Sequence, residues 1–224
     1  MATSAARSGD LEIREPRQER TRRAWARILD AGVALVEEGG YEAFTIAALC
    51  EKAQVPPRAL YDRTTNKDAL FLAVYEHGIA RITAEEQVFR DPAPWVDLSP
   101  AALVTAAVSE LTALFRRHAA FLKPVVLLSG VHPEVLRRGR AHVHSLADAF
   151  SGLLLEHTRE GITQPDPEQA VRQCFATVFS ACVLRTAHGA DFATTEVDHD
   201  TFTAYLALTA RRALLAHDGP TADS

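Results

Sequence analysis

Hydrophobic residues recur at every third or fourth position through most of this chain, which is the spacing of amphipathic helices. The first stripe predicts a long helix over residues 17–38 and consists of Ala24, Ile28, Ala31 and Leu35. Gly39 and Gly40 follow it and favour a left-handed cap that ends the helix. No segment alternates with the two-residue period of a half-buried strand, so the pattern predicts an all-α protein.

Further helix starts are predicted where a capping residue or a first-turn proline precedes a new hydrophobic stripe. These starts are Asn66 or Thr65, Ser99-Pro100, Pro133-Glu134, Asp166-Pro167 and the box Thr195-x-x-Asp198. The helix after Pro100 is expected to run to about His118, and its stripe continues past a predicted break at Lys123-Pro124. The separate helix that starts near Pro133-Glu134 is expected to run to about Glu160 and to end at Gly161.

Residues 45–67 are predicted to form two short helices joined by a tight turn. Thr45 is a good cap for the first helix, whose apolar face is Ile46, Leu49, Cys50 and Ala53. Pro57 suits the first position of the second helix, where a missing amide proton costs nothing, and Leu60 is expected to face inward. This is the pattern of a helix-turn-helix, which offers the start of its second helix to a DNA major groove. The alternative is an αα-hairpin inside a larger helical core.

Residue types suggest how this motif would contact DNA. Arg58 is the candidate for a base-edge contact, because a guanidinium can donate two hydrogen bonds to guanine. The candidates for contact with a thymine methyl are Pro57 and Ala59. The candidates for phosphate contacts are Thr45, Tyr61, Arg63 and Lys67.

The motif and its surroundings resemble the TetR family of bacterial transcriptional regulators, over roughly residues 20–71. The family-like runs are Arg20-x7-Ile28-Leu29-x-Ala31-Gly32-x2-Leu35, Gly39-Gly40-Tyr41-x2-Phe44-Thr45, Ala53-x-Val55-x-Pro57-Arg58-Ala59-Leu60-Tyr61 and Asn66-Lys67-x-Ala69-Leu70. Three features depart from the family. Gln54 occupies a turn position that is usually glycine and must tolerate a positive φ. Arg63-Thr64 replaces a usual His-Phe, and Asp62 adds a carboxylate where phosphates are expected.

The resemblance implies a three-helix, helix-turn-helix DNA-binding head followed by a larger helical body that binds ligand and dimerises. With the composition, it predicts a disordered arm over residues 1–16, the head over 17–68, the body over 69–217 and a flexible tail over 218–224. In this family the last two helices, here about 168–188 and 198–216, form a four-helix bundle across a two-fold axis. The helix from Glu168 to about His188 is apolar on more than one face, so each of these faces must pack against other residues. It is either the central helix of the body or is covered on one face by a second copy of the protein.

The family also implies a pocket for a small effector between the middle helices. Aromatic, aliphatic and histidine side chains make the candidates for this ligand site: Trp95, Phe115, His118, Leu122, Val126, His142, Leu146, Phe150, Phe175 and Phe179. The two histidines have two interpretations. Each is either a core histidine with a hydrogen-bond partner or a polar contact inside a mostly apolar pocket.

Charge divides the 224-residue chain unevenly. Residues 14–27 hold six arginines against two glutamates, whereas the whole chain carries a net charge of −5, so the acidic excess falls in the later two thirds. A basic segment beside the helix-turn-helix suits a DNA-reading head on an acidic body.

Several other classes of protein lack their signals. We find no nucleophile elbow, phosphate-binding glycine loop, paired carboxylates or metal-ligand set, so neither an enzyme nor a cofactor or metal is predicted. The three cysteines, Cys50, Cys174 and Cys182, have no metal or redox spacing and are expected to be buried thiols. With 47% hydrophobic residues but no signal peptide and no apolar stretch near ~20 residues, the chain is expected to be cytoplasmic.

These patterns together predict a ligand-responsive transcriptional regulator. Repression is implied by the resemblance alone: a dimer would bind a palindromic operator in double-stranded DNA and be released by a small, mostly apolar effector. The alternative is a helical adaptor that binds protein and has no sequence-specific affinity for DNA.

Overall fold

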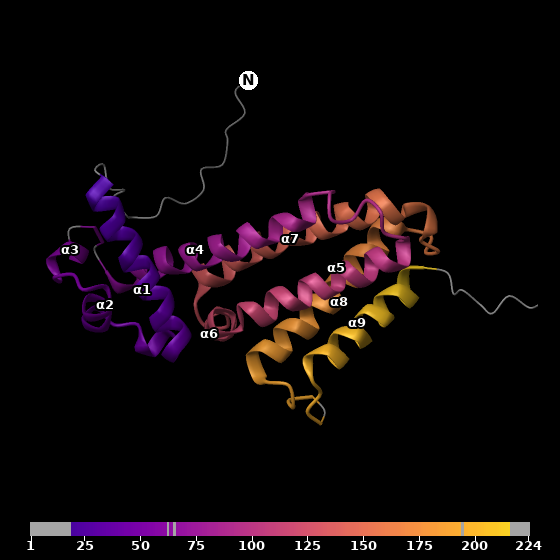
Figure 1. The fold of residues 1–224 in the computed structure, drawn as a ribbon. Coiled ribbons are helices and arrows are strands. Elements are labelled where there is room, and N and C mark those ends of the chain that lie inside the picture. The colour runs from indigo at the N-terminus through magenta and orange to yellow at the C-terminus, as the bar shows by residue number, and fades with distance from the viewer. Residues whose placement is uncertain (1–18, 62, 65, 194, 216–224) are drawn as a thin grey trace, which may run out of the picture. The chain divides into compact units, whose positions relative to one another are not determined.

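The computed structural model describes residues 19–61, 63–64, 66–193 and 195–215. The all-α prediction is confirmed: these residues form helices, with one isolated antiparallel bridge between Ile162 and Leu215. The helices are α1 Glu19–Ala43, α2 Ile46–Ala53, α3 Arg58–Tyr61, α4 Lys67–Glu86, α5 Pro100–Arg117, α6 Ala119–Ser129, α7 Pro133–Thr158, α8 Pro167–His188 and α9 His199–Leu214. Two 3-10 turns, Gln87–Arg90 and Arg159–Gly161, follow α4 and α7 (Figure 1).

The chain divides into two compact units, and the division falls after Arg81, within α4. We call residues up to Arg81 the head and residues from Ile82 the body. The sequence placed this division at residue 68 instead. The predicted arm over residues 1–16 and tail over 218–224 lie outside the described residues.

The head has its own hydrophobic core between α1, α2, α3 and the first part of α4. Its fully buried side chains include Ile28, Phe44, Leu49, Leu60, Leu70, Phe71 and Val74. The ring of Phe71 meets Phe44 and Tyr41 edge-on, with centroids 5.5 and 4.8 Å apart. Gly32 lets α1 approach α4 closely, because a Cβ there would lie 2.3 Å from a methyl carbon of Val74.

Local capping in the head follows the sequence closely. Gly39 and Gly40 leave helical geometry, and the φ of Gly40 is +66°, so the regular part of α1 ends there before one further turn. The Thr45 hydroxyl accepts a hydrogen bond of 3.1 Å from the amide of Ala48 and caps α2. The side chain of Asn66 caps α4 through a 2.7 Å bond from the Ala69 amide.

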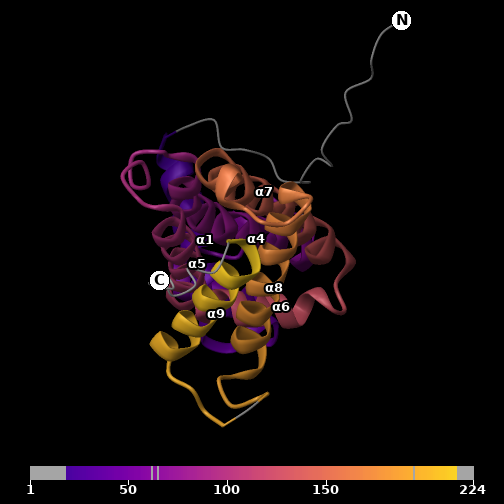
Figure 2. The same cartoon turned by 90° about the vertical axis from the view of Figure 1, so that its right-hand side faces the viewer.

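The body packs α5 against α9, and α8 against α6, α7 and α9, as the two views show (Figures 1 and 2). One hydrophobic cluster joins these helices and includes the fully buried Leu103, Leu111, Phe150, Leu154, Val171 and Leu214. Side-chain caps begin α5 and α8 as predicted. The Ser99 hydroxyl accepts from Ala102 at 3.3 Å and the Asp166 carboxylate accepts from Gln169 at 3.0 Å.

The predicted break at Lys123-Pro124 is wrong, because α6 passes through Pro124. The chain breaks at His118 instead, whose φ and ψ are −104° and 14°. A proline inside a helix removes one amide donor to the carbonyl four residues earlier. That carbonyl belongs to Ala120, an exposed residue of the first turn, so water can replace the missing bond.

The start of the last helix also differs from the prediction. The Thr195-x-x-Asp198 box would make Thr195 the cap. In the structure the cap is Asp198, whose carboxylate accepts from the Thr201 amide at 2.8 Å and from its hydroxyl at 2.7 Å. Helix α9 therefore begins at His199, and it ends at Leu214 rather than near residue 216.

Candidate nucleic-acid interface

The turn between α2 and α3 has the conformation that the sequence predicts. Gln54 ends α2 in the left-handed region, with φ 53° and ψ 50°, and is the one non-glycine residue with a positive φ in the described chain. The amide of Val55 donates to the carbonyl of Cys50 at 3.0 Å and closes the turn. The strain at Gln54 is thus accepted so that two helices can meet within a few residues.

Helix α3 is a single turn that presents its polar side outward. It begins at Arg58, one residue later than predicted, and Pro57 lies just before it with its carbonyl accepting from Leu60 at 3.0 Å. Leu60 is fully buried, as expected. Arg58 is exposed and Tyr61 is 65% exposed, so both side chains lie on the outer surface of the head, whereas Ala59, Arg63 and Lys67 are half-buried.

Two further cations next to α3 lie on aromatic rings of α1. The guanidinium carbon of Arg63 lies 5.3 Å from the centroid of the Trp25 ring, and the ammonium of Lys67 lies 4.2 Å from that of Tyr41. Both distances are within the range of a cation–π interaction. Burial first, and then the carboxylates of Asp68 and Glu42, raise the pKa of Tyr41.

The sequence analysis did not identify these rings as part of the interface. Trp25 is the first aromatic residue of the chain and stands among arginines, where a solvated helix face would carry a polar side chain. An aromatic residue in such a polar segment is the only sign in the sequence that this position has a special role. It does not reveal the partner, because Arg63 is 38 residues away in sequence and only the fold brings the two together.

Electrostatic pairing separates the cations of the motif into two groups. Lys52 on α2 pairs with Glu38 at 2.7 Å. In contrast, Arg58, Arg63 and Lys67 make no ion pair with any carboxylate among the described residues. Positive charge without an internal partner, beside an exposed helix start, is what phosphate binding requires.

Five of the ligand-site candidates of the body lie in one row of aromatic rings, whose neighbours are stacked, tilted or edge-on. Neighbouring ring centroids lie 5.4 to 6.2 Å apart along the series Trp95, Phe89, Phe150, Phe175, Phe179 and Phe115. The sequence missed Phe89, the second ring of this row. Five candidates are buried in the core, namely Trp95, Phe115, Leu146, Phe150 and Phe175. The rings therefore fill the space between the helices with one another.

An open groove of about 350 Å³ lies beside this row. It is lined by two of the candidates, Val126 and Phe179, together with Leu127, Ser180, Val183, Leu184, Ala187 and His188. Leu122 packs against the core next to it. The walls of this groove are mostly apolar.

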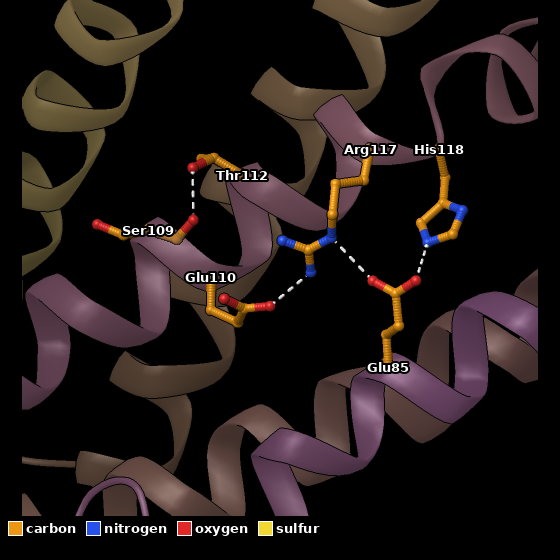
Figure 3. A network of polar contacts seen from close by, with 6 residues as sticks. All are labelled: Glu85, Ser109, Glu110, Thr112, Arg117 and His118. Carbon is orange, nitrogen blue, oxygen red and sulfur yellow. Dashed lines mark hydrogen bonds and ion pairs between the residues drawn. The ribbon is translucent and has the colours of Figure 1, made fainter.

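Both candidate histidines have carboxylate partners. His118 Nε2 lies 2.9 Å from Glu85, which also accepts from Arg117 at 2.8 Å, and Arg117 reaches Glu110 at 2.6 Å (Figure 3). Partial burial would raise the pKa of Glu85, but the hydrogen bonds from Arg117 and His118 outweigh it and lower that pKa.

His142 is held in a drier place. Its Nε2 lies 3.1 Å from the carboxylate of Glu86, whose residue is only 3% exposed. Each histidine is half-buried and has the hydrogen-bond partner of the first interpretation, but neither lies in the fully buried core. Contact with a ligand stays a prediction.

The cysteines are buried free thiols, as expected. Burial raises the pKa of Cys174 to about 11 and that of Cys182 to about 12, although Arg185 acts in the opposite direction on Cys182. A thiol with so little thiolate is a poor nucleophile and a poor redox sensor. Elsewhere in the described chain, no three His, Cys, Asp or Glu side chains gather as a metal site would require. Across the same residues, every helix is too short or too polar to cross a bilayer.

Comparisons with known proteins agree with this geometry. Residues 28–74, which span most of α1 to the first part of α4, match the sequence model of bacterial regulatory proteins of the tetR family. No curated protein matches the chain.

Several solved structures share the fold. A TetR transcription regulator from Haloarcula marismortui has a TM-score of 0.66 at 16% identity and covers 87% of this chain and 99% of its own. A TetR-like transcriptional regulator from Rhodococcus sp. RHA1 has a TM-score of 0.61 at 21% identity, with 89% and 97% covered. A second regulator from that organism has a TM-score of 0.63 at 17% identity, with 86% and 98% covered.

Proposed function

We propose that this chain, whose residues 28–74 match the sequence model of bacterial regulatory proteins of the tetR family, is a transcriptional regulator that acts as a ligand-responsive repressor. A homodimer binds a palindromic operator through its two helix-turn-helix motifs, and a small apolar effector releases it. The observation that carries the proposal is the exposed start of α3, flanked by cations that have no carboxylate partner among the described residues.

Arg58 is the proposed reader of the operator. It lies at the first position of α3 and is exposed, so its guanidinium is free to donate to guanine O6 and N7. Pro57 and Ala59 on either side offer apolar contact to a thymine methyl. Thr45, Tyr61, Arg63 and Lys67 would fix the register on the phosphates.

The test is an anisotropy titration of the full-length protein across a salt series. The duplexes are the DNA upstream of its own gene and sites selected from a random library. We expect salt-dependent binding, with Arg58→Ala weakening it by about 1–3 kcal/mol, roughly 10- to 150-fold, and relaxing the preference at one base pair. Lys52→Ala is the matched control, because Lys52 already pairs with Glu38, and it should change affinity less than about twofold.

A helical adaptor would give a different result. If neither the upstream DNA nor the selected library yields a preferred duplex at any salt concentration, the proposal of sequence-specific DNA binding is wrong. The helical adaptor that binds protein is then the favoured hypothesis.

Dimerisation is proposed through α8 and α9. Apolar side chains stay exposed on these helices and on the segment between them: Leu184 at 41%, Phe192 at 59%, Tyr205 at 69% and Leu208 at 38%. A groove of about 480 Å³ also runs between the two helices, with Cys174, Val178, Leu206 and Ala210 in its walls. A second copy would cover this surface, and two heads would then read half-sites about 34–36 Å apart.

Light scattering coupled to gel filtration tests the dimer. Tyr205→Glu places a charge in the proposed interface and should give a monomer that binds the operator far more weakly. Val96→Glu alters a similarly exposed apolar residue on the α4–α5 connection and should remain dimeric. A dimeric Tyr205→Glu variant would exclude this face.

The effector is proposed to be small and mostly apolar, because the groove beside the aromatic row has apolar walls and a volume within the usual range of ligand sites. Binding there would favour a conformation of the body in which the heads no longer fit the operator. With the operator in hand, a screen of aromatic and aliphatic compounds should find one that dissociates the complex. Val126→Arg should abolish release by the effector without changing operator affinity. Val131→Arg, on the exposed turn before α7, should leave both release and operator affinity unchanged.

A further inference from the structure

We propose that Trp25 is a positioning residue for DNA binding, which holds the Arg63 guanidinium on its ring so that the guanidinium edge faces a phosphate. The inference rests on the proposed DNA-binding function. It assigns a role to a residue of α1, outside the helix-turn-helix.

The geometry places the Arg63 guanidinium on the Trp25 ring, with no polar side-chain partner among the described residues. Its guanidinium carbon lies 5.3 Å from the Trp25 centroid, and both side chains are half-buried. Among the described residues Arg63 donates no side-chain hydrogen bond and has no carboxylate within ion-pair distance. Trp25 lies three residues before the fully buried Ile28, so one turn of α1 fixes the ring against the head.

Stacking on a ring leaves the hydrogen-bonding capacity of an arginine intact. The guanidinium is flat, and its five N–H donors point outward in its plane. When the flat face lies on an indole, the edge donors stay free for two oxygens of one phosphate. A carboxylate partner would instead use those donors and cancel the charge. The ring therefore orders Arg63 without neutralising it.

Tyr41 and Lys67 repeat this arrangement. The Lys67 ammonium lies 4.2 Å from the Tyr41 centroid, and the Tyr41 ring is itself fixed edge-on to Phe71 at 4.8 Å. Two cations four residues apart are thus each set on a ring of the same helix, α1. This repetition favours a shared role over a chance contact, since Arg63 lies between α3 and α4 and Lys67 is the first residue of α4.

Pre-ordering raises affinity because a long side chain that is already fixed loses less rotamer entropy on binding. From the strength of exposed cation–π contacts, Trp25→Leu should weaken operator binding by about threefold to fivefold. Trp25→Phe keeps a ring face and should restore most of that loss. Arg63→Ala should weaken binding further and lower the salt slope by about 0.9, because one phosphate contact is gone.

A double-mutant cycle on the full-length protein separates positioning from simple support of the fold. The four proteins are wild type, Trp25→Leu, Arg63→Ala and the double variant, titrated with a library-selected duplex at several salt concentrations. We expect Trp25→Leu to cost affinity in the wild type and almost nothing once Arg63 is alanine. Circular dichroism melting of each variant measures the fold independently.

The outcomes distinguish this inference from the function beneath it. If wild type binds its duplex and Trp25→Leu binds equally well, or loses the same factor in the Arg63→Ala background, then Trp25 does not act through Arg63 and the inference is overturned. If wild type prefers no duplex, the proposed function is overturned and this inference with it.

Discussion

Cations of the helix-turn-helix surface and of one part of the body have different surroundings. In the body, several arginines are matched with carboxylates: Arg117 with Glu85 and Glu110, and Arg137 and Arg138 with Glu134, although Arg185 lies over the Phe202 ring and donates to the Val197 carbonyl. On the helix-turn-helix surface of the head, Arg58, Arg63 and Lys67 have no such partner among the described residues, and two of them rest on rings.

The difference shows which charges serve the fold and which are left for a partner. An arginine that is paired inside the protein already donates hydrogen bonds to a carboxylate. The negative charge of that carboxylate largely cancels its electrostatic attraction for a distant anion. The whole acidic excess of the chain lies beyond residue 81, so the body would repel DNA. The unpaired cations of the head therefore form the surface that we propose to bind phosphates.

The largest effect that would test this division is a loss of stability in the body. His142→Leu removes the partner of the Glu86 carboxylate, which lies in a residue only 3% exposed. Breaking a buried pair costs roughly 3–5 kcal/mol, and we expect the lower end, about 3 kcal/mol, because the His142 side chain is 18% exposed. Urea denaturation at neutral pH measures the free energy of unfolding.

Two variants serve as controls for that measurement. The double variant Glu86→Leu with His142→Leu should recover most of the loss, since no stranded carboxylate remains. Arg159→Leu breaks an ion pair with Glu168 whose side chains are 55% and 53% exposed, and it should cost less than about 1 kcal/mol. A cost for His142→Leu no larger than that of Arg159→Leu would show that the buried pair does not support the body.

The next effect should appear in DNA binding and leave stability unchanged. Lys67→Gln removes a cation that has no carboxylate partner in the described chain, so operator affinity should fall by about 1 kcal/mol, roughly fivefold, at all sequences alike. The salt slope should fall by about 0.9. Arg117→Gln, in the body, should change neither the affinity nor the slope in the same anisotropy titration. Equal slopes for all three proteins would contradict the division of cations drawn here.

The sequence predicted well those features that depend on neighbouring residues. Caps at Thr45, Asn66, Ser99 and Asp166 involve an amide only three residues away, so the residue type and a following stripe suffice. The positive φ of Gln54 is also predicted, because the resembling family usually has glycine at this turn position.

Features that depend on tertiary context were missed. Pro124 should end a helix by its own chemistry, but the carbonyl that it leaves without a donor belongs to an exposed residue, so the helix continues. Trp25 and Arg63 meet only because α1 and the segment after α3 share one core. For the same reason the sequence could list most aromatic residues of the body but could not show that they form one row.

The smallest effect concerns the paired charges of the body and their dependence on pH. Hydrogen bonds from Arg137 are the main cause that lowers the pKa of Glu134 from 4.5 to about 2. Partial burial acts in the opposite direction, and a further hydrogen bond from Arg138 lowers the pKa again. A carboxyl whose pKa is lower in the folded state stabilises the fold above its ordinary pKa. This contribution is lost as the pH falls from about 4.5 through 2. Because the Glu134 side chain is 33% exposed, solvent screening should limit the effect to less than about 1 kcal/mol.

Glu134→Gln should therefore unfold at a slightly lower urea concentration at pH 7 and match wild type near pH 2, with operator affinity at pH 7 unchanged. A loss of affinity at pH 7 would mean that the paired charges of the body also serve DNA binding, and the contrast between the two units would not hold.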